Sequence, residues 1–168
     1  MKLNKAFKFR LLPNQDQIDL LGKTFGCCRS IYNKMLEDKI KYYEETKKNL
    51  SVTPAQYKQE FEWLKEVDSY SLCNEQMNLQ TAFNNFFRNP KVGFPKFKSK
   101  KSDKSSYTTS NVSNIIRVND KHQIHLCKLG WVKFVEHRKI PTDYKIKSAT
   151  ITKTPSGKYY ISILTEYE

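Results

Sequence analysis

One stretch near the middle of the chain, residues 88–104, has the residue types that bind a polyanion. Two aromatic rings, Phe94 and Phe97, stand among seven cations and one acid, and two prolines and a glycine disfavour a helix. Such a segment suits a polymer whose phosphates repeat along a line and whose bases have flat faces. We call this stretch the basic junction; it predicts contact with nucleic acid, and a solvated basic linker is the alternative.

Cations outside the basic junction are expected to act with it. We expect Phe94 and Phe97 to stack on bases, and lysine and arginine side chains to contact the nucleic-acid backbone. These backbone contacts are predicted for Lys2, Lys8, Arg10, Arg29, Lys91, Lys96, Lys98, Lys100, Lys101 and Lys104.

The composition of the whole chain supports an acidic partner. Among 168 residues, 30 Lys and Arg stand against 17 Asp and Glu, a net charge of +13 at pH 7. This balance suits nucleic acid or an anionic membrane surface. Most of the cations are lysines, which hold phosphate without discriminating bases, so binding should be strong and sensitive to salt.

Membrane, metal and cofactor classes have little support in the sequence. No window approaches the ~18 apolar residues of a membrane span, and the N-terminus has no signal-peptide pattern, so we expect a cytoplasmic protein with no membrane partner. His122 and His125 are three apart in an expected strand and should face opposite sides. No metal site and no cofactor is predicted. Reduced, mostly buried thiols are expected for Cys27, Cys28, Cys73 and Cys127.

The carboxylates do not form a recognisable catalytic set. Phosphodiester hydrolysis by two metals needs several carboxylates around cations ~4 Å apart, whereas the acids of the first helix are scattered along solvated faces. The five glycines form no phosphate-cradling loop. No catalytic residue is predicted, and this chain alone is not expected to be an enzyme.

Apolar periodicity divides the chain into two kinds of structure. Residues 2–12 alternate and predict a strand with a cationic outer face. Helices are predicted after Asn14, after Thr53 and near Asp68, each with a capping signal. Gly22 and Gly26 weaken the first helix, which predicts that another backbone, of protein or nucleic acid, approaches it closely.

Beyond the basic junction the period drops to two, and six short strands follow without helices. We therefore predict an α+β fold in which three helices are inserted into a small β-barrel or curled sheet. The N-terminal strand should join this sheet. The expected limits are 1–13 for the first strand, 14–89 for the helical lobe, 90–104 for the basic linker and 105–168 for the remaining strands.

Seven ordered blocks together resemble one family along essentially the whole chain. They are KAFKFRLLPN (5–14), FGCCRSIYN (25–33), WLKEV (63–67), AFNNFF (82–87), GFPKFK (93–98), KLGWVK (128–133) and TPSGKYY (154–160). The chain resembles the N-terminal portion of TnpB, also called OrfB. This is a family of transposon-encoded RNA-guided nucleases related to the type V CRISPR effectors.

The resemblance implies a wedge-like β-barrel interrupted by a helical recognition lobe, which together hold a guide RNA and read a short motif on duplex DNA. The motif-reading positions of the family correspond here to Val52, Gln56, Ser69, Cys73, Ser110 and Asn111. Gln56 and Asn111 have the amide chemistry for adenine edges, and Val52 could touch a thymine methyl group. Alternatively, Gln56 serves a capping box, Ser69 an N-cap and Cys73 the core.

In the family, the nuclease domain begins shortly beyond the position at which this chain ends. We therefore expect a part that binds guide RNA and double-stranded DNA without cutting. Two alternatives are open: a free-standing DNA-binding transcriptional regulator, and one half of a split nuclease whose catalytic half is encoded separately.

Overall fold

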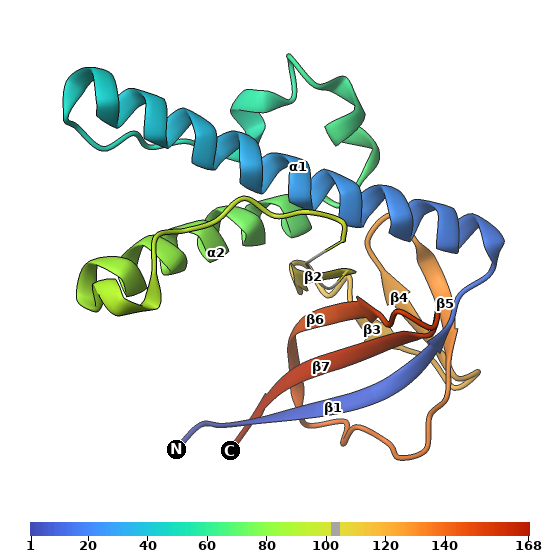
Figure 1. The fold of residues 1–168 in the computed structure, drawn as a ribbon. Helices are drawn as coiled ribbons and strands as arrows, with labels where there is room; N and C mark the ends of the chain where they lie inside the picture. Colours follow the sequence, from blue (N-terminus) through green and yellow to red (C-terminus); the bar gives the residue numbers. More distant parts are fainter. Residues whose placement is uncertain (102–104) are drawn as a thin grey trace. The chain divides into compact units, whose positions relative to one another are not determined.

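The computed structural model describes residues 1–101 and 105–168 (Figure 1). The chain forms two compact units, which we call the sheet unit (Met1–Phe25 and Lys104–Glu168) and the helical unit (Gly26–Asp103). The α+β class predicted from the sequence is confirmed.

Seven antiparallel strands form one sheet with the order β2-β6-β7-β1-β5-β4-β3. The N-terminal strand lies between β7 and β5, so the prediction that it joins the sheet is confirmed. The strands are β1 (Leu3–Leu12), β2 (Ser105–Ser110), β3 (Arg117–Val118), β4 (Gln123–Leu126), β5 (Gly130–Phe134), β6 (Lys145–Lys153) and β7 (Tyr159–Tyr167).

Among the described residues the edges of the sheet are not paired as strands, so of the predicted β-barrel or curled sheet the structure shows the curled sheet. The two edge strands, β2 and β3, follow each other in sequence and are joined by only residues 111–116. So short a connection requires the two edges of the sheet to come close. The Asn111 side chain bridges them: its Oδ1 accepts from Ile116 N–H at 2.9 Å, and its Nδ2 donates to Ile116 O at 3.2 Å.

Alternation along β1 builds the core of the sheet unit. Phe7, Phe9 and Leu11 are at most 2% exposed, and Phe7 and Phe9 lie opposite Ile163 and Ile161 of β7. Burying each such side chain contributes about 1.5–3 kcal/mol. Lys8 and Arg10 point to the other, solvent-accessible face, as predicted from the period of two.

Helix α1 (Gln15–Thr46) begins with the predicted capping box. Asn14 Oδ1 accepts from Gln17 N–H, and Gln17 Oε1 accepts from Asn14 N–H, both at 2.9 Å. Gly22 and Gly26 are not explained by close packing: no described atom lies within 4 Å of a Cβ built on Gly22, and Gly26 would meet only the Arg29 guanidinium at 3.9 Å.

The described residues of the helical unit form two α-helices rather than the predicted three. The chain after Thr53 forms two short 3₁₀ helices, η1 (Pro54–Tyr57) and η2 (Glu62–Glu66), before α2 (Ser69–Arg88). The buried apolar residues of this segment do not recur every three or four positions, as the buried face of one helix requires. They are Val52, Tyr57, Leu64 and Val67. The Tyr57 hydroxyl also donates to Asp38 of α1 at 2.7 Å, which fixes η1 locally.

Helix α2 begins at the predicted place, with Asp68 Oδ1 accepting from Tyr70 N–H at 2.8 Å. Of the cysteines, Cys27 and Cys28 are buried, Cys73 is exposed and Cys127 is half-buried. Burial raises the pKa of the Cys28 thiol to about 12, so this group is a protonated core side chain. Among the described residues, no helix is long and apolar enough to cross a membrane.

Candidate nucleic-acid interface

The described part of the basic junction, residues 88–101, is largely irregular, as its prolines predict. A single 3₁₀ turn, η3 (Pro90–Val92), is capped by Asn89, whose Oδ1 accepts from Lys91 N–H at 3.2 Å. Gly93 follows with φ +92°, a conformation that favours glycine. The lysines that lie exposed along this segment are Lys91, Lys96, Lys100 and Lys101. Lys104 was also expected to contact nucleic acid, and it lies outside the described residues.

Lys98 differs from its neighbours because the fold of the helical unit uses it. Its backbone is held by the Asn33 side chain, which accepts from Lys98 N–H at 2.7 Å and donates to Lys98 O at 2.9 Å. Its ammonium lies 3.3 Å from Glu75 Oε2 and 4.2 Å from the centre of the Tyr32 ring. Because Glu75 is only 3% exposed, Lys98 is the counter-ion of a buried carboxylate.

Burial and the Lys98 ammonium act in opposite directions on the pKa of the Glu75 carboxyl. Burial raises the pKa of the Glu75 carboxyl above its usual range, and Lys98 opposes that rise with its charge and hydrogen bond. Loss of Lys98 would leave an uncompensated carboxylate in the core. Lys98 therefore has a structural role, whether or not it also contacts phosphate.

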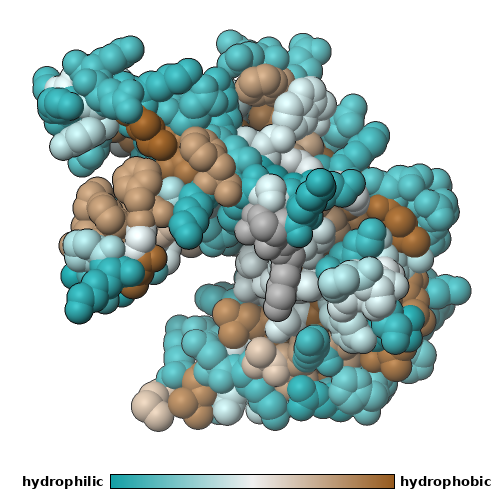
Figure 2. Space-filling view, viewed as in Figure 1, coloured by the Kyte–Doolittle hydropathy of each residue, from teal (hydrophilic) through white to brown (hydrophobic). Residues whose placement is uncertain are grey.

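The two aromatic residues of the basic junction have different surroundings. Phe94 packs edge-on against Phe83 and Phe86 of α2, with ring centres 5.4 Å apart in both pairs, and remains 45% exposed. In the space-filling view, apolar side chains gather where Figure 1 places the C-terminal end of α2 (Figure 2). Phe97 is 56% exposed and lines a hollow of the helical unit together with Trp63.

The remaining predicted backbone contacts are spread over both units. On β1, Lys8 and Arg10 are exposed, and the Lys8 ammonium lies 5.0 Å from the Tyr160 ring centre. Lys2 is exposed and forms a 3.8 Å ion pair with Glu166. Arg29, on α1, is half-buried.

Of the predicted motif-reading residues in the helical unit, Gln56 and Cys73 are exposed and Ser69 is half-buried. Gln56 Oε1 accepts from Thr53 N–H at 3.3 Å, which completes the predicted capping box. Its Nε2 has no hydrogen-bond partner among the described residues. Val52 is only 7% exposed, so little of it can reach a thymine methyl group. Cys73 is not a core residue, contrary to the structural alternative considered above.

The other two predicted motif-reading residues belong to the sheet unit. Ser110 ends β2, opposite Ser148 of β6. The amide of Asn111 is fully engaged: besides its bonds to Ile116, its Nδ2 donates to Ile146 O at 2.9 Å. To present this amide to adenine, the protein would have to give up hydrogen bonds that join the two edges of the sheet.

Two features at the surface were not anticipated. The first is Trp131, 38% exposed, with the Arg117 guanidinium 5.3 Å from its ring centre and the His125 ring 5.2 Å away. The second is Trp63, 43% exposed beside Phe61. A pair of aromatic residues two apart, just before a helix cap, was the available signal for Trp63.

Comparison with known proteins identifies the family. A family model described as a helix-turn-helix domain of the OrfB type matches residues 1–48, which here form β1 and α1. InsQ of Escherichia coli K12, described as a candidate RNA-guided DNA endonuclease, is 30% identical over the whole chain. A protein of Streptomyces pristinaespiralis with the same description is 29% identical over 98% of the chain.

The chain spans 42% of the length of each of these two relatives. The virulence protein VsdF of Salmonella dublin is 32% identical over 57% of the chain, which covers 93% of VsdF. The match to InsQ extends over the whole chain and so includes the strand, the long helix and the basic junction described above. The chain therefore belongs to the TnpB/OrfB family of transposon-encoded RNA-guided DNA endonucleases, and it corresponds to the N-terminal region of that family.

Proposed function

We propose that this chain holds a guide RNA and reads a short motif on duplex DNA, and that it cuts neither by itself. The observation that carries the proposal is the basic junction. There, four exposed lysines and the exposed ring of Phe97 lie on a segment that Asn33 fixes to a folded helical unit. Fixed cations beside an exposed ring suit a polymer of phosphates and bases. Its relatives are described as RNA-guided, which supports RNA as one partner.

Base reading by this chain is proposed chiefly for Gln56. Its amide nitrogen has no hydrogen-bond partner among the described residues, and the side chain is exposed. An amide that accepts and donates side by side fits the N6 and N7 positions of adenine. Ser69 is the first residue of α2 and Cys73 lies in the following turn, and both side chains are proposed to add contacts to the same DNA.

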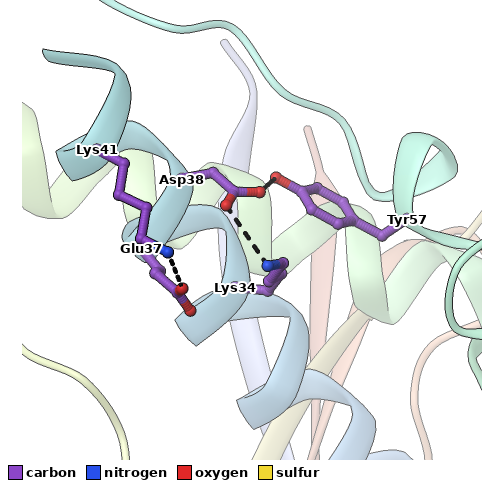
Figure 3. A network of polar contacts seen from close by, with 5 residues as sticks. All are labelled: Lys34, Glu37, Asp38, Lys41 and Tyr57. Atoms are coloured by element: carbon purple, nitrogen blue, oxygen red, sulfur yellow. Dashed lines mark hydrogen bonds and ion pairs between the residues drawn. The ribbon is translucent and has the colours of Figure 1, made fainter. Parts of the chain in front are cut away.

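The proposal that the chain does not cut is supported by the surroundings of its carboxylates. On α1, Asp38 accepts from the Tyr57 hydroxyl at 2.7 Å and lies 3.6 Å from Lys34 Nζ, while Glu37 lies 2.7 Å from Lys41 Nζ (Figure 3). Glu75 is paired with Lys98 in the core of the helical unit. These acids neutralise neighbouring cations, a structural role that does not bring several carboxylates around one metal position.

Sequencing of RNA recovered with the purified protein tests the guide-holding function. A discrete RNA species, protected from nuclease by the protein, is the expected result. Recovery of no RNA, together with tight duplex binding, would favour a free-standing DNA-binding regulator. Cleavage of labelled duplex by the chain alone with Mg²⁺ would contradict the proposal, whereas cleavage only after addition of a separate nuclease half would indicate a split enzyme.

Gln56→Glu tests base reading separately from capping. Glutamate keeps the oxygen that caps Thr53 N–H but cannot donate to adenine, so we expect the preference for individual base pairs to relax by about 1–3 kcal/mol. Gln59→Glu, at an exposed glutamine three residues away, is the control for the added charge. Equal, sequence-independent weakening by both variants would show that Gln56 does not read bases.

A further inference from the structure

A hollow of about 330 Å³ on the helical unit has two exposed aromatic side chains in its lining. Trp63, in η2, and Phe97, in the basic junction, are 43% and 56% exposed, although burial of such rings is favourable. Phe61 and the α1 residues Ser30, Lys34 and Glu37 also line it. The volume is near the lower end of the range for small-molecule pockets, about 300–1,000 Å³.

The chain segments that carry the two rings are fixed within the helical unit. Phe97 immediately precedes Lys98, whose N–H and C=O are both bound by the Asn33 side chain, at 2.7 and 2.9 Å. Trp63 packs against Phe61, with ring centres 5.5 Å apart. Because the backbone beside Phe97 and the Trp63 ring are already positioned, a flat ligand that stacks on the two rings pays less ordering entropy.

The α1 side of the hollow offers a cation beside a carboxylate. Lys34 and Glu37 lie three residues apart on the same helix, and both line the hollow. Lys41 holds one oxygen of Glu37 at 2.7 Å and lowers the pKa of that carboxyl, which is therefore ionised. The other oxygen of Glu37 has no partner among the described residues (Figure 3).

The occupant best matched by these groups is an unpaired base of an RNA strand. Lys96, Lys100 and Lys101 flank Phe97 and are exposed, which favours a ligand with phosphates on either side of its ring. Duplex DNA keeps its bases stacked inside, whereas loops of a folded RNA present unpaired bases that stack on aromatic side chains. Guanine offers an acceptor, O6, next to two donors, N1–H and N2–H, which complements Lys34 beside Glu37.

We propose that this hollow binds one unpaired guanine of single-stranded RNA, stacked on Trp63 and Phe97 with its Watson–Crick edge toward Lys34 and Glu37. The inference rests on the proposed RNA-binding function and adds a specific base site to it. Phe97 was expected to stack on bases; the structure adds Trp63 and the polar side of the hollow.

Tryptophan fluorescence gives a direct test, because the chain has only two tryptophans, Trp63 and Trp131. In a Trp131→Phe protein, the emission comes from Trp63 alone. Titration with a uridine-rich RNA heptamer that carries one central guanine should quench this emission as the base stacks. An unchanged emission at saturating RNA, with binding seen by fluorescence anisotropy, would overturn the base site while leaving RNA binding intact.

Matched variants measure how much the hollow contributes to affinity. Trp63→Ala and Phe97→Ala should each weaken binding of the heptamer by about tenfold, because each removes one stacking partner. Phe87→Ala removes the same ring as Phe97→Ala, from a position that is 64% exposed on the same unit but does not line the hollow, and it should change affinity less than twofold. Similar effects of all three variants would contradict the site.

Substitution of the central base tests the polar side. Heptamers with adenine, cytosine or uracil in place of guanine should bind about tenfold more weakly, and Glu37→Gln should remove that preference. Equal binding of all four heptamers would contradict the guanine assignment. Failure of every RNA to bind would instead contradict the proposed function itself, so the two failures are distinguishable.

Discussion

The two units of this chain present different surfaces. Six large aromatic side chains are exposed among the described residues, and only Trp131 belongs to the sheet unit. The other five lie in the helical unit: Tyr43, Trp63, Phe87, Phe94 and Phe97. In the sheet unit, alternation places aromatic side chains such as Phe7, Phe9 and Phe134 in the core, each at most 3% exposed. Exposed aromatic rings are thus concentrated in the helical unit, whereas exposed cations lie on both units.

The two units also differ in whether a side-chain amide is already used in hydrogen bonds within the fold. Asn111 of the sheet unit uses its whole amide to join the edges of the sheet, whereas Gln56 of the helical unit uses one oxygen for a cap and leaves its nitrogen available. The comparison shows that a suitable residue type is not sufficient for base reading. The side chain must also be free of structural duties.

The largest expected effect is on the stability of the helical unit, from Lys98→Glu. A second carboxylate beside the buried Glu75 should lower the free energy of unfolding by about 3 kcal/mol. Lys100→Glu, at an exposed position two residues away, makes the same charge change and should have little effect on stability. Urea unfolding followed by circular dichroism measures both variants. Equal stability of the two would show that Lys98 is not a counter-ion of the core.

The corresponding test of the sheet unit is Asn111→Ala. Loss of the amide leaves Ile116 N–H and the Ile116 and Ile146 carbonyls without their bridge, which should cost about 2 kcal/mol. Asn111→Asp keeps the acceptor for Ile116 N–H and should cost less. Normal unfolding of Asn111→Ala, with a lost preference at one base pair, would instead assign this residue to DNA reading.

A smaller effect is expected from the titration of Glu75. Because burial raises its pKa in the folded protein, the folded state binds this proton more tightly than the unfolded state, where the pKa is near 4.5. The stability that comes from this group is therefore present below about pH 4.5 and is lost as the pH rises through the folded-state pKa. Glu75→Gln should remove this part of the pH dependence. Urea unfolding of Glu75→Gln and of the unaltered protein between pH 4 and 8 measures the pH dependence of their free energies of unfolding. Identical pH dependence of the two proteins would contradict a contribution of Glu75.

The smallest expected change is a gain in stability from Gly22→Ala. Gly22 is exposed inside α1 and nothing described lies within 4 Å of an added Cβ, so alanine should stabilise the helix by about 0.5–1 kcal/mol. Thermal unfolding measures this gain. If a nucleic-acid backbone approaches at this position, the same variant should bind RNA or DNA more weakly; unchanged binding would exclude that approach.

Much of the fold could be predicted because local patterns and tertiary structure agree. Short-range chemistry accounts for the period of two in β1 and for the Asn14 cap of α1. It also accounts for the turn between β6 and β7, in which Gly157 N–H donates to Thr154 O at 2.9 Å. The sequence could not exclude an α-helix after Thr53, since Thr53 and Pro54 begin an α-helix and a 3₁₀ helix equally well. Its conversion to 3₁₀ turns depends on buried contacts of Tyr57 and Leu64, which only the folded chain makes.

The candidate site was predictable in composition but not in detail. The charge of the basic junction identifies a polyanion partner, yet nothing in the sequence distinguishes Lys98 from Lys100. That distinction comes from Asn33 and Glu75, which are 65 and 23 residues away. Likewise, Asn111 and Gln56 have the same functional group, and only their hydrogen bonds separate them.

The central claim is that the basic junction contacts nucleic-acid phosphates, and the salt dependence of RNA binding tests it most directly. In the test variant, the four exposed lysines of the basic junction are changed to Gln: Lys91, Lys96, Lys100 and Lys101. In a control variant, four other exposed lysines are changed to Gln, which removes the same charge elsewhere on the chain. They are Lys48, Lys121, Lys139 and Lys158. The plot of log affinity against log salt should become shallower by about 0.7 for each lysine that contacts phosphate, so by nearly three in the junction variant. The control should keep a slope close to that of the unaltered protein. Equal slopes in the two variants would show that the basic junction is a linker and would contradict the account.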